Sequence, residues 1–207
     1  MPEILQRVAA LEFKKVRKIL LRSDWRYSSE REKGSYAYIL MELKPEDAKP
    51  AIEAAREKVK RTLGSAVKVK PLTPDRLEDL VYVFNRSMLA APDPYQPITL
   101  EEARKFPMES TFIAYLGERP VGFIVCTLEG RTGVIAGIGV DPAYRRRRIA
   151  TALALKATEY LAENGVEKVV CEVYEENKPS LSFIRSFGFK EAGRRYVVKA
   201  PEASSQA

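Results

Sequence analysis

The segment Gly139-Val-Asp-Pro-Ala-Tyr-Arg-Arg-Arg-Arg-Ile-Ala-Thr-Ala-Leu153 (GVDPAYRRRRIATAL) contains the transition that decides the fold. The small and apolar residues before it predict a strand that ends at Val140, because Pro142 cannot continue a sheet. A helix is expected to begin within the arginine run, at about Arg147, and to end near Glu163. A strand, a short loop and a helix in this order form a crossover that places a ligand at the helix N-terminus.

The arginine run itself is suited to an anion. The first turn of a helix carries backbone N–H groups without internal partners, and it lies at the positive end of the helix dipole. Four guanidinium groups strengthen that field, and the small residues Ala150 and Ala152 allow a ligand to approach. A pyrophosphate group fits this pattern. The alternative is a solvated basic turn or a nucleic-acid patch.

Outward from this segment, the pattern predicts a mixed sheet. Three strands with hairpin-length breaks precede the helix, and a strand, a short helix and a last strand follow it. These strands are Thr111–Leu116, Val121–Leu128, Val134–Val140, Val166–Tyr174 and Arg194–Lys199, and the short helix is Asn177–Phe187. Upstream lie a strand at Val67–Lys70, a helix opened by Thr73-Pro74, and a capping box, Thr99-x-x-Glu102. The fold class is therefore α/β (α+β), a mixed, mainly antiparallel sheet flanked by helices.

The first 64 residues are expected to form a small α–β–α unit. Residues 2–21 have helical apolar spacing, Ser35–Leu43 has strand composition, and Pro45–Leu63 is a charged helix that ends at Gly64. A further strand is expected near Trp25 and Tyr27. The expected organisation is a domain over 1–64, a second over 65–199, and a disordered tail over 200–207.

Composition limits the class of protein. Hydrophobic residues make up 45% and charged residues 30% of the chain, and no apolar run is long enough to cross a bilayer. Lysines and arginines interrupt the N-terminal apolar pattern, so it predicts an amphipathic helix and not a signal peptide, and a cytoplasmic protein. The scarcity of Asn and Gln beside many charged residues suggests a thermophilic source.

The absence of histidine excludes several chemistries. Serine–histidine and cysteine–histidine machinery and the commonest zinc ligands are all missing. Two cysteines, Cys126 and Cys171, lie in apolar strand-like runs and are expected to be buried free thiols.

Two ordered signatures resemble one family. The first is Val140-x-Pro142-x-Tyr144-Arg145-x-x-Arg148-Ile149-Ala150-x-x-Leu153, and the second is Glu172-Val173-x-x-x-Asn177-x-x-Ser180, followed by Phe187-Gly188-Phe189. Residues 66–199 thereby resemble a GNAT (GCN5-related N-acetyltransferase) domain, whose element order they match. Two signatures about thirty residues apart are more specific than either alone.

The resemblance implies an N-acetyltransferase that moves an acetyl group from acetyl-CoA to a primary amine by direct attack in a ternary complex. The acceptor is a small amine, a protein N-terminus or a lysine, and no metal is implied. Main-chain groups of the strand would pair with the pantetheine arm, an N–H near Val140 would stabilise the oxyanion, and N–H groups of the turn would hold the pyrophosphate. The implied cofactor-binding residues are Ile138, Gly139, Val140, Arg145, Arg146, Arg147, Arg148, Ile149, Ala150, Thr151 and Asn177.

Three positions depart from the family pattern. Arg148 stands where the family has a glycine, and a Cβ there is expected to crowd a phosphate or strain the turn. The strand Val134–Val140 lacks the glutamate that serves many members as general base. Ile184 occupies the place where a tyrosine often protonates the departing thiolate.

Replacement catalytic residues are available. Glu172 lies where some N-terminal amine acetyltransferases carry a histidine base; the alternative is a carboxylate paired with a basic side chain. Tyr174 and Tyr144 are candidate acids or substrate contacts, with packing or surface roles as the alternative. In the loop from Met88 to Pro97, Asp93 either attracts the amine or stabilises a turn.

A second class of function stays open. The chain can instead be a catalytically silent GNAT fold that binds acyl-CoA, a nucleic acid or a protein. Residues 1–64 contain 15 Lys and Arg against 10 Asp and Glu, an excess of +5 out of the total of +7, together with several aromatic residues. That combination suits RNA, a small basic domain with its aromatics in its own core, or a homodimer.

Overall fold

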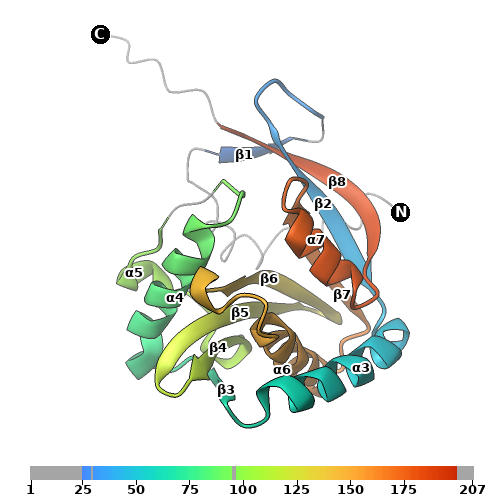
Figure 1. Cartoon of the computed structure of the whole chain (residues 1–207). Coiled ribbons are helices and arrows are strands. Elements are labelled where there is room, and N and C mark those ends of the chain that lie inside the picture. Colours follow the sequence, from blue (N-terminus) through green and yellow to red (C-terminus); the bar gives the residue numbers. More distant parts are fainter. Residues whose placement is uncertain (1–24, 29, 95–96, 200–207) are drawn as a thin grey trace.

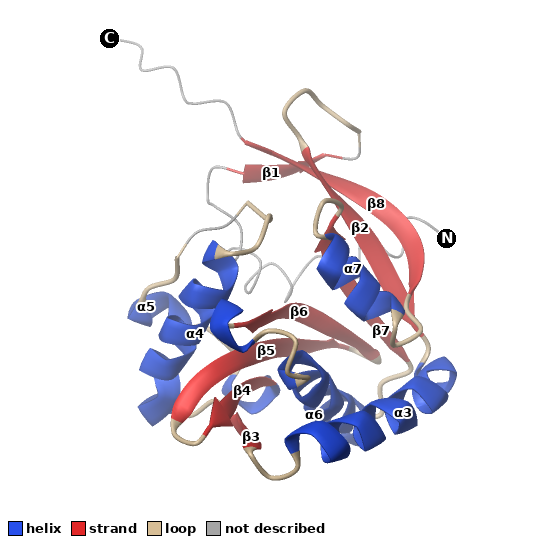
Figure 2. Ribbon diagram, viewed as in Figure 1, coloured by secondary structure: helices blue, strands red, loops and turns tan. Residues whose placement is uncertain are grey.

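The computed structural model describes residues 25–28, 30–94 and 97–199. Within them one sheet has the strand order β1-β8-β2-β7-β6-β5-β4-β3 (Figures 1 and 2). The strands are β1 (Trp25–Ser28), β2 (Tyr36–Leu43), β3 (Val67–Pro71), β4 (Thr111–Leu116), β5 (Arg119–Glu129), β6 (Thr132–Val140), β7 (Lys168–Tyr174) and β8 (Lys190–Lys199). The helices are α3 (Pro45–Leu63), α4 (Leu77–Leu89), α5 (Leu100–Ala103), α6 (Ile149–Glu163) and α7 (Lys178–Arg185), with 3-10 turns at Pro74–Arg76, Met108–Ser110 and Pro142–Tyr144.

The sheet is mixed in the way expected. Strands β6 and β7 pair in parallel, and the other recorded pairs are antiparallel. The parallel pair exists because α6 connects β6 to β7 as a crossover. The predicted fold class is confirmed.

The two faces of the sheet carry separate cores. On one face α3, α6 and α7 cover sheet residues such as Met41 and Ile124, and Leu153 of α6 belongs to the same core. On the other face α4 and α5 cover β4 to β6, where the rings of Phe84 and Phe123 lie 4.9 Å apart between centroids. The second core therefore lies over only one half of the sheet, and this asymmetry positions the site.

Strand β2 joins the N-terminal part of the chain to this sheet. It lies between β7 and β8, with Tyr38 opposite both Tyr174 and Arg195. The helix that follows, α3, packs against α6. The expected boundary between residues 64 and 65 therefore does not separate two sheets, and residues 36–63 form part of the same layered structure. Residues 2–21 and the tail over 200–207 lie outside the described residues.

The position of β2 in the sheet has a physical reason. The buried residues of β2 alternate along the strand, which leaves one face for α3 and α7 and both edges for hydrogen bonding. Local composition predicts such a strand, but it does not say which strands lie at its edges.

Most predicted elements are found within a few residues of their expected ends. The strand Thr111–Leu116 and the helix Pro45–Leu63 match at both ends, and the last strand begins at Lys190, before the expected Arg194. In the predicted capping box, Thr99 N donates to Glu102 Oε2 at 2.7 Å and Glu102 N donates to Thr99 Oγ1 at 3.2 Å. Among the helices that the structure describes, none has the length and apolar character required to cross a membrane.

Candidate active site

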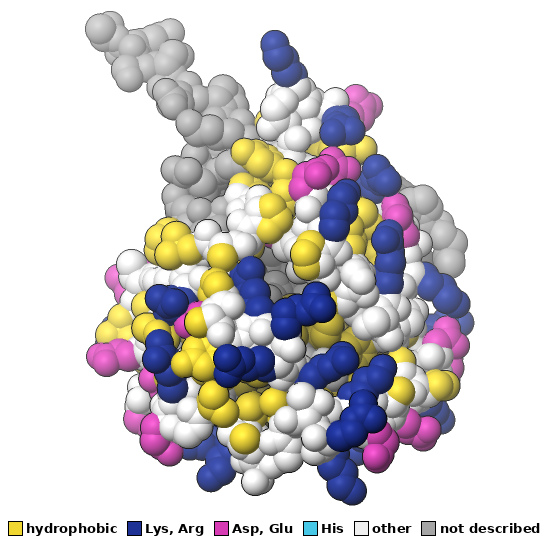
Figure 3. Space-filling view, viewed as in Figure 1, with side chains coloured by type: hydrophobic (Ala, Val, Ile, Leu, Met, Phe, Trp, Pro, Cys, Tyr) yellow, Lys and Arg dark blue, Asp and Glu magenta, His cyan; other side chains and the backbone are white. Residues whose placement is uncertain are grey.

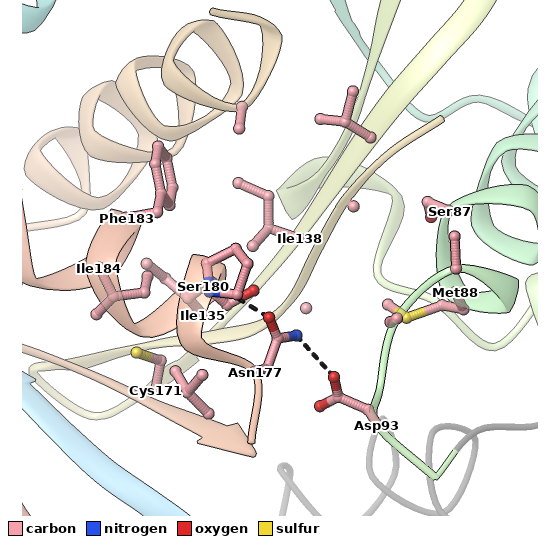
Figure 4. A pocket seen from close by; sticks show the side chains of 18 of the residues that line it. Ser87, Met88, Asp93, Ile135, Ile138, Cys171, Asn177, Ser180, Phe183 and Ile184 are labelled. Atoms are coloured by element: carbon pink, nitrogen blue, oxygen red, sulfur yellow. Dashed lines mark hydrogen bonds between the residues drawn. The ribbon is translucent and has the colours of Figure 1, made fainter. Parts of the chain in front are cut away.

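The site begins where two parallel strands separate. Strands β6 and β7 pair from Thr132 opposite Lys168 to Ile135 opposite Cys171. Beyond this apex β6 continues to Val140 beside β5, and β7 continues to Tyr174 beside β2. The space between the diverging strands is a cavity of about 630 Å³, lined from both strands and from the loops at their ends (Figure 4). Among the described strands, none pairs with the part of β6 beyond Ile135 on the side that faces the cavity.

Gly139 shows how closely α4 approaches this wall. A Cβ at Gly139 would lie 2.4 Å from Ser87 Oγ and 2.6 Å from Phe123 Cε1. No other residue fits there without moving α4 or β5. The glycine thus lets the helix support the part of β6 that lines the cavity.

The turn after β6 is built on Asp141. This residue is fully buried, and its carboxylate accepts hydrogen bonds from Arg86 Nε at 2.7 Å and from Ala143 N at 3.0 Å. Burial opposes ionisation of Asp141, but the hydrogen bonds from Arg86 and Ala143 outweigh it and lower the pKa of the carboxyl. The pair ties the turn to α4. Sequence analysis did not single out Asp141, although an aspartate before Pro142 at the end of a strand is a turn signal.

The four arginines of the run have different positions. The guanidinium of Arg145 donates to three carbonyl oxygens, those of Val140 (3.3 Å), Ala90 (3.3 Å) and Ser87 (3.1 Å). It therefore fastens the end of α4 to the turn. The guanidinium of Arg147 lies over the ring of Tyr144, 5.4 Å from its centroid.

Arg146 and Arg148 hold the turn in an unusual conformation. Their φ angles are 65° and 64°, in the left-handed region that favours glycine. The side chain of Arg148 is exposed, so its Cβ meets no packed core. The backbone shape that a glycine would favour is thus adopted with arginine in place, at a cost of about 1–2 kcal/mol per residue.

The turn places the N-terminus of α6 at the cavity. Ala152 N donates to Arg148 O at 3.0 Å, and the N–H groups of Ile149, Ala150 and Thr151 precede the first bond of this kind. These three residues line the cavity. Lys and Arg side chains gather on this face of the molecule, around the start of α6 (Figure 3). Free amide donors, a helix dipole and positive charge together fit a phosphate-bearing ligand.

The structure brings together nearly all of the predicted cofactor-binding residues. Those that line the cavity are Ile138, Gly139, Val140, Arg145, Arg146, Arg148, Ile149, Ala150, Thr151 and Asn177. Arg147 is not among the lining residues, and its guanidinium lies over the ring of Tyr144.

The opposite wall carries the predicted base, Glu172. Its side chain is 11% exposed and lines the cavity, and its Oε1 lies 3.3 Å from Nη1 of Arg195 on β8. The ion pair is the arrangement that sequence analysis gave as the alternative to a catalytic role. Glu172 therefore both lines the cavity and forms an ion pair.

The predicted acids lie in two different places. Tyr174 is not a lining residue; its ring lies beside those of Tyr36 and Tyr38, at centroid distances of 5.8 and 5.6 Å. Burial and the nearby Glu176 raise the pKa of Tyr174. Tyr144 lines the cavity beyond Val140, and Val140 itself lies five strand residues, about 17 Å, from the apex at Ile135.

A polar link crosses the cavity between α7 and the loop after α4. Asn177 Oδ1 accepts from Ser180 N at 3.2 Å and caps α7, while Asn177 Nδ2 donates to Asp93 Oδ2 at 2.7 Å (Figure 4). Burial raises the pKa of Asp93, and the hydrogen bond from Asn177 opposes part of that rise. Both residues line the cavity.

Nucleophilic and metal-ligating groups give no competing site. Cys126 and Cys171 are buried free thiols, as predicted, and burial raises the pKa of each to about 12. Thiols with such pKa values are poor nucleophiles at neutral pH. Across the described ranges, no group of three or more Cys, Asp or Glu residues is placed to hold a metal ion.

The family follows from a comparison with known domains. Residues 77–189, more than half of the chain, match the model of the acetyltransferase (GNAT) family. The chain therefore belongs to the GNAT family of acetyltransferases, as the two signatures indicated.

One similar protein is N-alpha-acetyltransferase 30 of Homo sapiens, 32% identical over 140 residues, which cover 59% of this chain and 39% of that protein. The chain spans only 36–39% of the length of this relative and of its counterparts from Xenopus laevis and Mus musculus.

Solved structures share the fold at lower identity. The ribosomal-protein-S18-alanine N-acetyltransferase of Escherichia coli superposes with a TM-score of 0.55 at 17% identity, over 68% of this chain and 98% of that one. The PaiA N-acetyltransferase of Thermoplasma acidophilum, solved in complex with coenzyme A, has a TM-score of 0.55 at 19% identity, over 64% of this chain and 98% of that one.

Proposed function

We propose that this protein transfers an acetyl group from acetyl-CoA to the α-amino group of a protein or peptide. The observation that carries the proposal is the cavity between β6 and β7, which joins an unpaired strand edge to the N-terminus of α6. The similarity to N-alpha-acetyltransferase 30 supports an N-terminal amine over a small amine or a lysine.

The residues of the β6 side would bind the co-substrate. Main-chain groups from Ile138 to Val140 would pair with the pantetheine arm as an added strand would, and the amides of Ile149 to Thr151 would bind the pyrophosphate. Arg146 and Arg148 line the same end and add positive charge. Acetyl-CoA supplies a thioester, which an amine attacks without a metal.

Proximity would provide much of the rate. Holding a neutral amine close to a thioester replaces an encounter between two molecules with a reaction inside one complex. The predicted roles of Glu172, Tyr174 and Tyr144 remain proposals. The ion pair of Glu172 with Arg195 and the aromatic neighbours of Tyr174 give both residues structural roles as well.

A peptide assay tests the proposal. Lysine-free peptides with a free N-terminus, N-terminally blocked peptides with one lysine, and a small diamine would each be incubated with acetyl-CoA and followed by mass spectrometry. We expect acetylation of the free N-terminus, with a KM for acetyl-CoA below about 1 mM. Transfer to the blocked peptide or the diamine alone would contradict the proposed acceptor.

The silent-binder alternative is decided by the same experiment. The buried Ile184, where the family often has a tyrosine, is the observation that favours it. Calorimetric binding of acetyl-CoA without transfer to any of the three acceptors would support that alternative over an enzyme.

A further inference from the structure

The loop that follows α4 places one carboxylate in the cavity. Helix α4 ends at Leu89, and the residues from Ala90 to Pro94 line the cavity from the side opposite α7. Asp93 stands between Pro92 and Pro94, and its side chain points toward Asn177 (Figure 4). Prolines on both sides restrict the backbone at Asp93.

The orientation of the Asn177 amide is fixed independently of Asp93. Its carbonyl oxygen accepts the backbone N–H of Ser180 as the cap of α7. The amide NH2 group must then face Asp93, and it donates to Oδ2 at 2.7 Å. Asp93 therefore acts as an acceptor in this contact, and lone pairs on its carboxylate remain for a further donor.

Asp93 forms no ion pair with another described residue, because the charged groups around it have other partners. From the turn, the Arg145 guanidinium is directed to the carbonyls of Ala90 and Ser87. From β7, Glu172 is held by Arg195, and Tyr174 lies near enough for the Asp93 charge to contribute to its raised pKa. The other titratable lining groups are Tyr38, Tyr144, Arg146, Arg148 and Cys171, whose thiol is held neutral by burial.

Glu172 and Asp93 thus differ in the consequence of accepting a proton. A proton on Glu172 would weaken its ion pair with Arg195, whereas a proton on Asp93 removes a charge that burial disfavours. Burial raises the pKa of Asp93, which makes this carboxylate a better proton acceptor than an exposed aspartate.

We propose that Asp93 is the catalytic residue that takes the proton from the ammonium group of the acceptor, and that Asn177 is the residue that positions it. The inference rests on the proposed acetyl transfer. The R–NH3+ group passes one proton to the Asp93 carboxylate, and the neutral amine then forms the C–N bond with the thioester carbonyl. The C–S bond breaks, the remaining extra proton on nitrogen goes to the coenzyme A thiolate, and Asp93 returns its proton to solvent.

The test compares the pH dependence of kcat/KM for wild type, Asp93→Asn and Glu172→Gln on a lysine-free peptide with a free N-terminus. In the wild type the reactive pair is ammonium and carboxylate, so kcat/KM should be flat between the pKa of Asp93 and that of the amine, near 8. In Asp93→Asn only the neutral amine reacts. Its kcat/KM should be about 100-fold lower at pH 6 and rise about tenfold per pH unit.

Three further readouts keep the outcomes distinct. Asp93→Glu should recover part of the activity, and calorimetric binding of acetyl-CoA should be the same in the wild type and Asp93→Asn, which also checks that the variant is folded. The assignment of Asp93 would be overturned if Asp93→Asn kept the flat pH profile of the wild type. It would also be overturned if Glu172→Gln showed the pH profile expected for Asp93→Asn. A wild type without any transfer would overturn the proposed function and this inference together.

Discussion

The two walls of the cavity are built in different ways. The β6 wall, with its turn and the start of α6, is made from one continuous stretch of chain, residues 132–151. The β7 wall is made from three strands, β2, β7 and β8, of which β2 is far from the other two in sequence. The first wall presents main-chain groups and a helix terminus. The second presents side chains whose state depends on their partners from other strands, as Glu172 depends on Arg195.

This difference separates their tasks in the proposed reaction. Main-chain recognition suits a co-substrate that is the same in every turnover, whereas side chains on paired strands can vary with the acceptor. The hydrogen bond between Asn177 and Asp93 joins the two walls. Asp93 lies in the loop after α4, which Arg145 fastens to the β6 wall, and Asn177 follows the end of β7.

Adding a methyl group to the backbone of each wall should have unequal effects. Gly139→Ala places a Cβ within 2.4 Å of Ser87 Oγ, so we expect a loss of about 2–3 kcal/mol in the free energy of unfolding and weaker acetyl-CoA binding. Gly193→Ala on β8 is the matched control, because its Cβ would lie at an ordinary 3.5 Å from Leu40 Cδ1. Its effect should stay within about 0.5 kcal/mol. Urea unfolding measures both, and equal losses would contradict the contrast.

Removing the buried charge of the turn should destabilise the β6 wall in a pH-dependent manner. The pKa of Asp141 is lowered in the folded state, so its contribution is present above the ordinary aspartate pKa of about 4 and is lost as the pH falls through the lower, folded pKa. Asp141→Asn should therefore cost about 2 kcal/mol at pH 7, and the difference from wild type should shrink below pH 4. Urea unfolding at several pH values would show this. A difference that does not change with pH would mean that the lost charge is not the cause.

On the β7 wall, a double-mutant cycle should detect the ion pair. Glu172→Gln and Arg195→Gln should show a coupling energy of about 1.5 kcal/mol in unfolding experiments, because both side chains are largely buried. The pair of Arg194 and Glu175, 3.7 Å apart with half of the arginine exposed, serves as the comparison and should couple by less than about 0.5 kcal/mol. Equal coupling in the two cycles would show that burial does not strengthen the first pair.

Replacing Arg148 should have the smallest effect. Arg148→Gly and Arg148→Ala remove the same charge, but only glycine adopts a φ of 64° without a Cβ penalty. We expect the glycine variant to be more stable than the alanine variant by about 1 kcal/mol in urea unfolding, with similar acetyl-CoA affinities in calorimetry. A large gain in affinity for Arg148→Gly would instead indicate that Arg148 impairs binding.

The difference between the two walls also explains which parts of the site could be predicted from sequence. The strand, turn and helix around Arg145 to Ala150 follow from local signals, which is why nearly all of the predicted cofactor-binding residues line the cavity. The insertion of β2 between β7 and β8 does not follow from its own sequence, because strand pairing is decided by distant partners.

The details of individual side chains were least predictable. Arg145 resembled a phosphate ligand in sequence but donates to carbonyl oxygens of α4 and β6, and Arg147 lies on Tyr144. Asp93 carried only a turn signal between two prolines. Its contact with Asn177 joins residues 84 positions apart, and no local pattern reports such a contact.

Hydrogen exchange with and without acetyl-CoA would show which wall binds the co-substrate, because it reports on the amides of both walls in one experiment. Acetyl-CoA should slow exchange of amides in residues 136–140 and in the first turn of α6, residues 149–152, while the amides of β2 and β8 exchange as before. Protection confined to β2, β7 and β8, or no protection at saturating acetyl-CoA, would contradict the account.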